Sequence, residues 1–256
     1  MTGRVVLIGA GPGDPELITV KGARALRDAD VVIFDRLVAP ALLDLCRPEA
    51  ERLYVGKEPG RAAVPQQQIC SLLVEHATSG RVVARLKGGD PLVFGRGGEE
   101  LLACASAGVS CEVIPGITSA VAAPAAAGIP VTHRGIARSF AVVTASTAGS
   151  AHAPDAVDLG RVATAVDTLV LLMAAGKLEA TCRALITAGR PSDEPAAIIQ
   201  WATTPEERSA IATLEELPPL AAAAGIGPPA TLVVGAVASI PAETAALAAL
   251  TPAGHP

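Results

Sequence analysis

Residues 83–100 read VARLKGGDPLVFGRGGEE, and this stretch is the most informative of the chain. The short apolar run that leads into it, from Val82 to Leu86, predicts a buried strand. The strand ends in Lys87-Gly88-Gly89-Asp90-Pro91, where two adjacent glycines let the backbone turn tightly and lie close to a ligand. A helix pattern begins at Glu99. Because open α/β sheets bind ligands beyond the carboxyl ends of their strands, the turn predicts a binding loop. A plain strand-to-helix turn with a surface aspartate is the alternative.

The first 115 residues alternate between apolar strands and helix-like segments. This order predicts a mostly parallel sheet with helices on both faces, because parallel neighbours need a crossover connection. A glycine, proline or charged residue follows each apolar run, as at a ligand-binding sheet edge. The predicted strands are 4–8, 31–34, 53–55, 82–86 and 111–114, and the predicted helices are 16–29, 66–79 and a segment ending near 107.

Pro115-Gly116 is the predicted boundary between two α/β lobes with a ligand cleft between them. The N-terminal lobe would cover 1–115, the C-terminal lobe 116–240 and a short tail 241–256. The polar, small-residue segment 145–165 predicts a variable loop with a short helix. The second lobe has predicted strands at 140–144, 168–173, 196–200, 208–213 and 231–237, and predicted helices at 117–127, 177–188 and 243–250.

Composition narrows the class of protein. The chain has 256 residues, 50% hydrophobic but only 2% aromatic, and a net charge of −5, which argues against general nucleic-acid binding. The longest apolar segment, 117–131, is interrupted by Pro124, Gly128 and Pro130 and is too short to span a bilayer. No signal-peptide pattern follows Met1, and the five cysteines and four histidines lack disulfide or metal-ligand spacing. We therefore expect a reduced, cytoplasmic protein without structural metal.

Basic residues gather near the glycine turns of this acidic chain, which predicts a positive site for a small polyanion. Ordinary solvated surface is the alternative for each of them. The set comprises Lys57, Arg61, Arg81, Arg85, Lys87, Arg96, Arg134 and Arg138.

The segment Gly9-Ala10-Gly11-Pro12-Gly13-Asp14, after the first predicted strand, is similar to a dinucleotide-binding loop. Its spacing is GxGxG rather than the GxGxxG of that fingerprint, and its prolines remove backbone donors. Asp35, which ends the second strand, could bind a ribose in this interpretation. It could equally accept a proton in a cleft, with Lys57 after the third strand as the matching acid, or form a surface ion pair.

Three residues of the second lobe have open roles. His133-Arg134 could bind an anionic group or cap an element. Met173 is more typical of a core than of a ligand contact, and Trp201 could flank an aromatic ligand or cover the end of the sheet.

Taken together, the motifs resemble the tetrapyrrole methylase family, and in particular its members that methylate uroporphyrinogen III. The resemblance runs from about residue 3 to residue 240. FDRLV and YVGK point to this activity, because other precorrin methylases share mainly the GxGPGD and GGDP features. The segments that carry it are VVLIGAGPGDPELITVKGARAL, DADVVIFDRLV, YVGKEPG, VARLKGGDPLVFGRGGEE, VIPGITSAVAAPAAAGIPVTHRG and ATLVVGAV.

The resemblance implies a two-lobed fold with mostly parallel or mixed sheets flanked by helices and the active site between the lobes. It implies two methyl transfers from S-adenosylmethionine to pyrrole carbons of uroporphyrinogen III, which give precorrin-2 by way of precorrin-1, on a route to siroheme or cobalamin. The product of the donor is S-adenosylhomocysteine, and no metal is needed. Family members form homodimers, so we expect one.

Site residues follow from the resemblance position by position. Asp35 corresponds to the proton acceptor and Lys57 to a proton donor. The cofactor contacts fall on Pro12, Gly88, Gly89, Asp90, Val93, Thr118, Ser119, Met173 and Ala202. Candidates for the eight substrate carboxylates are Arg36, Arg61, Arg85, Lys87, Arg96 and Arg134.

The chain departs from the family pattern at three places in the second lobe. Relatives often have Val-Thr-Gly-His where this chain has Val143-Thr144-Ala145-Ser146, and Met-Gly where it has Met173-Ala174. Ala202 replaces a glycine that contacts the cofactor. Each change is expected to add atoms near the cofactor and to alter its affinity.

No dehydrogenase–ferrochelatase domain precedes residue 1, so we expect a single activity. The alternatives are a precorrin methylase that acts later on the ring and, more remotely, a dinucleotide-binding regulatory module.

Overall fold

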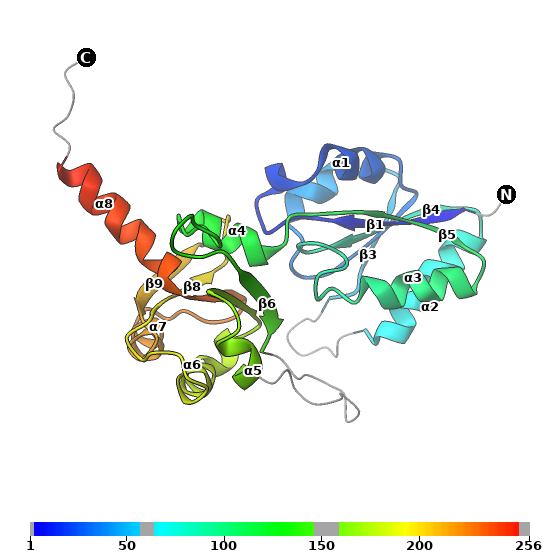
Figure 1. The fold of residues 1–256 in the computed structure, drawn as a ribbon. Helices are drawn as coiled ribbons and strands as arrows, with labels where there is room; N and C mark the ends of the chain where they lie inside the picture. The colour runs from blue at the N-terminus through cyan, green and yellow to red at the C-terminus, as the bar shows by residue number, and fades with distance from the viewer. Residues whose placement is uncertain (1–2, 57–63, 146–158, 251–256) are drawn as a thin grey trace, which may run out of the picture. The chain divides into compact units, whose positions relative to one another are not determined.

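The computed structural model describes residues 3–56, 64–145 and 159–250, with the backbone alone for 246–250. The chain divides into two compact units, Met1–Thr118 and Ser119–Pro256, each with its own sheet (Figure 1). The division falls three residues beyond the predicted Pro115-Gly116 boundary. The assignment of substrate and catalytic loops to one lobe and of the cofactor site to the other stays a prediction.

Unit 1 contains a five-stranded, fully parallel sheet. Its strands are β1 (Arg4–Gly9), β2 (Val31–Phe34), β3 (Glu51–Tyr54), β4 (Val82–Lys87) and β5 (Ser110–Ile114), in the order β3-β2-β4-β1-β5. Because all five strands run the same way, their carboxyl ends meet at one edge. The loops that the sequence singled out after β1, β2 and β4 therefore share that edge.

Helices cover both faces of this sheet. Successive side chains of a strand point to opposite faces, and apolar side chains of both sets pack against helices. Val5 and Leu7 pack with α2 (Gln66–Thr78) and α3 (Gly97–Ser106). Val6 and Ile8 pack with α1 (Val20–Arg27) and the 3-10 segment η2 (Pro40–Leu45). Both faces are thus buried, which explains why these strands read as continuous apolar runs.

Unit 2 contains a mixed sheet. Its strands are β6 (Phe140–Thr144), β7 (Thr168–Leu172), β8 (Pro195–Gln200), β9 (Arg208–Thr213) and β10 (Ala230–Val234), in the order β6-β7-β10-β8-β9. β6 and β7 are parallel, and β10 runs antiparallel to both β7 and β8. The carboxyl ends of β6, β7 and β8 therefore share one edge, where β10 begins.

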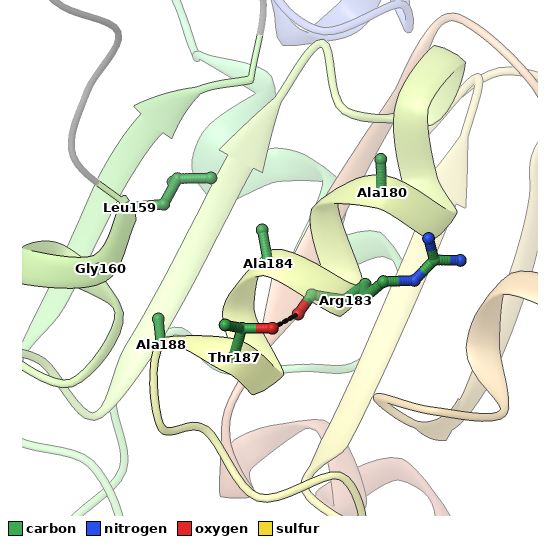
Figure 2. A pocket seen from close by; sticks show the side chains of 7 residues that line it. All are labelled: Leu159, Gly160, Ala180, Arg183, Ala184, Thr187 and Ala188. Atoms are coloured by element: carbon green, nitrogen blue, oxygen red, sulfur yellow. Dashed lines mark hydrogen bonds between the residues drawn. The ribbon is translucent and has the colours of Figure 1, made fainter.

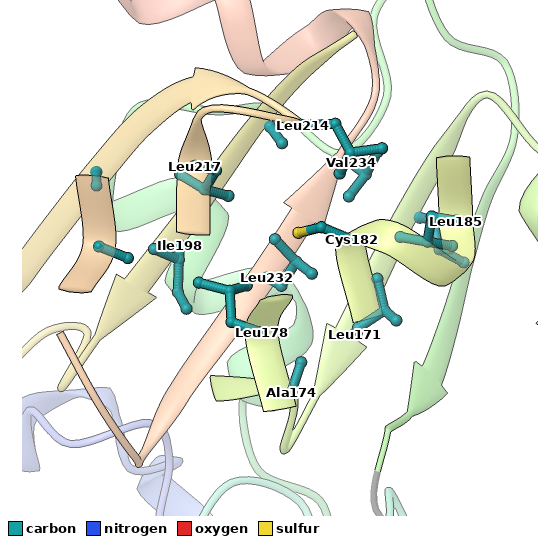
Figure 3. Close-up of a cluster of buried hydrophobic side chains, with 14 of the residues drawn as sticks. Leu171, Ala174, Leu178, Cys182, Leu185, Ile198, Leu214, Leu217, Leu232 and Val234 are labelled. Atoms are coloured by element: carbon teal, nitrogen blue, oxygen red, sulfur yellow. The ribbon is translucent and has the colours of Figure 1, made fainter. Parts of the chain in front are cut away.

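The main core of unit 2 lies between this sheet and the helices α5 (Leu159–Ala163), α6 (Leu178–Thr187) and α7 (Leu217–Ala223). Figure 3 shows Leu178, Cys182 and Leu185 of α6 against Leu171 and Leu232 of the sheet. The opposite face is covered by α4 (Ser119–Ala126) and the 3-10 segment η4 (Ala236–Ser239), followed by α8 (Ile240–Leu250).

The expectation of an α/β fold with two sheets flanked by helices is confirmed. The first predicted helix, 16–29, is wrong in extent: a short 3-10 turn η1 (Pro15–Leu17) precedes α1, whose N-terminus is capped by the Thr19 hydroxyl. α7 was not predicted, although its Pro218-Pro219 pair lies in the first turn, where proline is tolerated. Within the described residues, no helix is long and apolar enough to cross a membrane.

Candidate active site

At the strand edge of unit 1, the loops after β1 and β4 are joined by backbone hydrogen bonds. The Ala10 N–H donates to the Lys87 carbonyl at 2.7 Å. Gly11 and Gly89 exchange two bonds, with 3.2 Å from the Gly11 nitrogen and 2.7 Å from the Gly89 nitrogen. Both glycines have positive φ, +79° and +68°, which side chains of L-residues rarely adopt. The two glycine loops that the sequence singled out are therefore one continuous structure.

Three glycines from three strand ends lie in backbone contact here. A Cβ added to Gly9 would lie 2.4 Å from the Gly116 Cα, and one added to Gly116 would lie 2.2 Å from the Gly89 carbonyl oxygen. Neither position leaves room for any side chain. A Cβ on Gly88 would lie 2.8 Å from the Leu37 Cβ, so the loop after β2 closes on the same place. A side chain at any of these positions would collide with a neighbouring loop.

The carboxylate of Asp90 fastens this arrangement. One oxygen accepts the Leu92 N–H at 2.8 Å, and the other accepts the Gly116 N–H at 3.0 Å. Asp90 therefore links the loop after β4 to the loop after β5. The sequence predicted an acceptor for a ligand at this position, and the structure adds that both oxygens already bind backbone.

Asp35 lies at the end of β2, with its side chain 29% exposed. Its carboxylate accepts a hydrogen bond of 3.3 Å from the Arg85 guanidinium. Just before it, the Phe34 ring meets the Tyr54 ring edge to face at 5.5 Å, which packs the ends of β2 and β3 together. Asp35 is thus a half-buried carboxylate in an ion pair with a buried cation, not a member of a surface ion pair.

The basic residues predicted to bind an anion have different surroundings. Arg85 and Lys87 are each only 3% exposed and bind the carboxylate of Glu100. Arg96 is exposed and donates two 2.8 Å hydrogen bonds to the Glu99 carboxylate, which raise the pKa of its guanidinium. Further exposed members of the set are Arg36 and Arg134. Lys57 and Arg61 lie outside the described residues.

This burial corrects the expectation that Arg85 and Lys87 belong to a solvent-accessible basic set. They occupy alternate positions of a central parallel strand, so both point to the same covered face of the sheet. Burial, and next the charge of Arg85, lowers the pKa of the Lys87 ammonium. From these positions the two side chains serve unit 1 itself rather than a ligand's carboxylates.

The strand edge of unit 2 holds another group of predicted residues. Met173 follows β7 and Trp201 follows β8, and both have positive φ, +58° and +48°. The Trp201 N–H donates to the Pro229 carbonyl at 3.2 Å, just before β10 begins. Thr203, at φ +67°, donates its N–H to the Glu207 carboxylate at 2.7 Å. Backbone strain of this kind gathers at functional sites and is sustained by surrounding contacts.

Among the described residues outside glycine, positive φ occurs only on strand-end loops of the two sheets. The other cases, Phe94 at +53° and Arg96 at +60°, lie on the loop after β4. Among the predicted cofactor contacts, Met173 is 53% exposed. Those that are partly exposed are Pro12, Val93, Thr118 and Ser119. The structure thus gathers Pro12, Gly88, Gly89, Asp90 and Val93 at the loops of unit 1, and Met173 and Ala202 at the strand edge of unit 2.

Two of the departures from the family pattern point into hydrophobic cores. Ala174 is fully buried with the α6 core, in a right-handed backbone conformation that alanine adopts freely. Ala202 is 7% exposed and packs with Ile199 and Val237. The extra methyl groups therefore contribute to packing, and their expected effect on cofactor affinity stays a prediction. Ser146 lies outside the described residues.

The dinucleotide interpretation loses its structural basis. β1 ends at Gly9, but α1 does not begin until Val20, so the GAGPGD loop does not lead into a helix N-terminus. A pyrophosphate-binding loop depends on that N-terminus for its backbone donors.

Two surface hollows of unit 2 lie along α6 rather than at the strand edge. Figure 2 shows the first, where Leu159, Ala180, Ala184 and Ala188 form an apolar lining with the Arg183 side chain beside it. The second lies against α6 and α7. Neither includes any of the predicted site residues, and we assign them no role. Within the described residues, no group of three or more histidine, cysteine or carboxylate side chains could hold a metal.

Sequence reasoning missed Glu100, the fully buried carboxylate that binds both Arg85 and Lys87. A signal was present. Two basic residues at alternate positions of an apolar central strand require a buried counter-ion, and the Gly-Gly-Glu-Glu sequence at the start of the next helix supplies one.

Comparison with known proteins identifies the family of this chain. The sequence profile of the Tetrapyrrole (Corrin/Porphyrin) Methylases matches residues 4–218. The chain therefore belongs to the tetrapyrrole methylase family, and the resemblance inferred from its motifs is confirmed.

Two individual relatives show which activities occur among proteins similar to this chain. Uroporphyrinogen-III C-methyltransferase of Methanocaldococcus jannaschii is 47% identical over 241 residues, which cover 94% of this chain and 98% of that protein. Siroheme synthase of Pseudomonas aeruginosa strain PAO1 is 48% identical over 242 residues, but the match covers 93% of this chain and only 51% of that longer protein.

Solved structures show the same relationship. Uroporphyrin-III C-methyltransferase from Thermus thermophilus, complexed with S-adenosyl homocysteine, has a TM-score of 0.77 and 44% identity, and the match covers 93% of this chain and 100% of that one. A cobalt precorrin-4 methyltransferase has a TM-score of 0.82 at 30% identity, over 92% and 95% of the two chains. Diphthine synthase, at 22% identity and a TM-score of 0.62, shares the fold alone.

Proposed function

We propose that this protein transfers methyl groups from S-adenosylmethionine to two pyrrole carbons of uroporphyrinogen III, giving precorrin-2 by way of precorrin-1. The observation that carries the proposal is the 47% identity to an archaeal uroporphyrinogen-III C-methyltransferase over nearly the whole of both chains. The joined glycine loops of unit 1 lie in the segments that the family motifs specify.

The residues at the strand edges suit a flexible polar cofactor. In unit 1 the Gly9–Gly89–Gly116 contact packs three strand-end loops tightly together, and Asp90 holds them in place. We assign the cofactor contacts to Pro12, Gly88, Gly89, Asp90, Val93, Thr118 and Ser119, together with Met173 and Ala202 of the second edge. Bound S-adenosylmethionine supplies an already activated methyl group, so that the protein contributes mainly alignment and charge management.

Asp35 is the proposed proton acceptor. Methylation of a pyrrole carbon leaves the ring cationic, so that the ring must lose a proton from another of its atoms, and a carboxylate at the strand edge with 29% of its side chain exposed can receive it. The Arg85 guanidinium donates a 3.3 Å hydrogen bond to this carboxylate and thereby orients it. Lys57, the proposed proton donor, follows β3 in sequence and lies outside the described residues.

The substrate's carboxylates require accessible cations. Arg36, Arg96 and Arg134 are exposed and keep this role in the proposal, as does Arg61 outside the described residues. Arg85 and Lys87 are buried and leave this set. The homodimer and the cytoplasmic location remain predictions from the family resemblance.

A later precorrin methylase is the second candidate, because the cobalt precorrin-4 methyltransferase gives the TM-score of 0.82. Its identity is 30%, against 44% for the Thermus thermophilus enzyme and 47% for the archaeal one. Sequence identity decides here, since the fold is common to the family while substrate choice depends on particular side chains.

The test is incubation with uroporphyrinogen III and methyl-labelled S-adenosylmethionine under reducing conditions. Two labels per macrocycle support the proposal, whereas an unlabelled tetrapyrrole rejects it. Cobalt precorrin-4 offered in parallel identifies the alternative. Asp35→Ala should abolish most of the turnover while binding S-adenosylhomocysteine like the wild type, and an active Asp35→Ala protein would remove Asp35 from the mechanism.

A further inference from the structure

Four charged side chains of unit 1 form a network that reaches from the interior to the strand edge. Glu100 is fully buried, and one of its oxygens accepts three hydrogen bonds: 3.1 Å from Arg85, 3.0 Å from Lys87 and 3.1 Å from Gln66. Arg85 also donates at 3.3 Å to Asp35, the outermost member. We call Asp35, Arg85, Lys87 and Glu100 the charge network.

Strand geometry explains why these residues meet. Ile33 of β2 is paired with Arg85 of β4, so side chains of the same parity on both strands point to the α2–α3 face. Asp35 continues this parity beyond the end of β2, as Lys87 does on β4. Glu100 comes from the first turn of α3, which covers the same face and whose N-terminus favours a negative charge.

The network is balanced at two cations and two carboxylates, and Glu100 is indispensable to that balance. The side chains of Lys87 and Arg85 are each 4% exposed, so water cannot solvate their charges and each needs a carboxylate partner. Arg85 is also held by the carbonyls of Ile33 and Leu86, at 3.3 and 3.1 Å. Its guanidinium is thereby fixed from three sides, and the remaining nitrogen faces Asp35.

We propose that Glu100 is a positioning residue, which fixes the Arg85 guanidinium and through it the orientation of the Asp35 carboxylate. The inference rests on the proposed function, in which Asp35 accepts the proton. Glu100 does not meet the substrate, because it is fully buried. Its effect on the reaction passes through Arg85 alone.

The hydrogen bonds that hold the cofactor loop do not involve the side chains of this network. The loop after β4 is held by backbone bonds, with Ala10 on Lys87 and the Gly11–Gly89 pair, and by Asp90 on Gly116. Loss of the Glu100 charge therefore changes turnover while cofactor affinity stays near its original value. A purely structural residue would change both, or would only reduce the amount of folded enzyme.

The test compares Glu100→Gln with the wild type. Glutamine keeps the shape and one acceptor oxygen but removes the charge that binds Arg85. We expect kcat for methyl transfer to fall about 10- to 100-fold, as for other residues that orient a reacting group, with an unchanged Kd for S-adenosylhomocysteine by calorimetry. Glu179→Gln, the same change at an exposed ion pair with Arg183, is the matched control and should leave kcat unchanged.

A second comparison separates positioning from charge balance. Glu100→Gln alone leaves the network with one surplus cation. The double variant Lys87→Met/Glu100→Gln removes one cation together with one carboxylate, so it should fold even where Glu100→Gln does not. If Glu100 positions Arg85, kcat of the double variant lies about tenfold or more below that of Lys87→Met. Equal kcat values in the two proteins overturn the proposal, as does full kcat in Glu100→Gln.

Glu100→Asp covers the case in which neither glutamine variant folds. It keeps the charge but moves it one methylene away from Arg85. A folded Glu100→Asp enzyme with wild-type kcat overturns the proposal, and a reduced kcat at unchanged Kd supports it. Failure of the proposed function is distinguishable throughout, because a wild-type protein that methylates no tetrapyrrole shows it before any variant is compared.

Discussion

Replacing Gly116 by alanine is the sharpest perturbation of the glycine contact in unit 1. The new Cβ would lie 2.2 Å from the Gly89 carbonyl oxygen and 2.6 Å from the Gly9 Cα. Both neighbours are backbone, so no side chain can rotate away. The separation from Gly89 must grow by about 1.2 Å to reach an ordinary contact of 3.4 Å.

That movement has two energetic consequences. Overpacking of a tight site costs about 1–3 kcal/mol. The displaced Gly89 carbonyl also loses its 3.2 Å bond from the Gly11 nitrogen, which adds about 1 kcal/mol. For a chain of this size, a total of about 2–4 kcal/mol lowers Tm by roughly 5–15 °C. Because the same loops form the proposed cofactor site, affinity for S-adenosylhomocysteine should fall at least about tenfold, equivalent to about 1.4 kcal/mol.

Thermal unfolding and calorimetric titration with S-adenosylhomocysteine measure both effects. Gly98→Ala is the matched control, because a Cβ at that helical position meets nothing within 4 Å and alanine is the better helix former. It should unfold at or slightly above the wild-type Tm and bind normally. A Gly116→Ala protein that melts and binds like Gly98→Ala would refute the close contact of the three strand ends.

Three further outcomes are expected. Asp90→Ala should lose about 2 kcal/mol of stability, because the Leu92 and Gly116 N–H groups lose a charged acceptor. This variant should also bind S-adenosylhomocysteine less tightly than the wild type, and unchanged calorimetric affinity would contradict that expectation. Trp201 is the single tryptophan, so its emission should change on titration with S-adenosylhomocysteine, and a flat titration would place the ligand elsewhere. The hydrogen bond from the Val82 N–H, and next the Arg47 guanidinium, lower the pKa of Asp30. The ionised Asp30 side chain therefore stabilises the folded protein fully above the unfolded-state pKa of about 3.9, and this contribution is lost as the pH falls through the lower folded-state pKa. Urea unfolding of wild type and Asp30→Asn should therefore converge below about pH 4, and a constant difference would be the contrary result.

The elements that sequence reasoning placed well are those whose pattern has one physical explanation. The apolar run before the GGDP turn became β4, and β2, β6 and β9 have the predicted bounds. Buried parallel strands bounded by glycine, proline or charge leave little ambiguity. The strand-end rule also placed Asp35, Asp90 and Met173 at the carboxyl edges of their sheets.

The errors have equally specific causes. Helical periodicity from residue 16 hid a 3-10 turn, because Thr19 accepts the Gly22 N–H and starts the helix afresh there. β10 ends at Val234 rather than 237, since Gly235 adopts φ +141° and the chain turns into a 3-10 segment. The sequence predicts Arg85 and Lys87 to be surface cations, because charged residues are normally exposed. Only the packing of α3 on the sheet reveals that Glu100, fifteen positions after Arg85, binds both of them.

Hydrogen exchange on addition of S-adenosylhomocysteine tests the proposed assignment of the cofactor contacts. This assignment predicts protection in the segments around residues 9–14 and 88–97 and, at the same ligand concentration, around 172–174 and 201–204. Protection confined to one of these groups, or centred on the α5–α6 hollow of Figure 2, would contradict it.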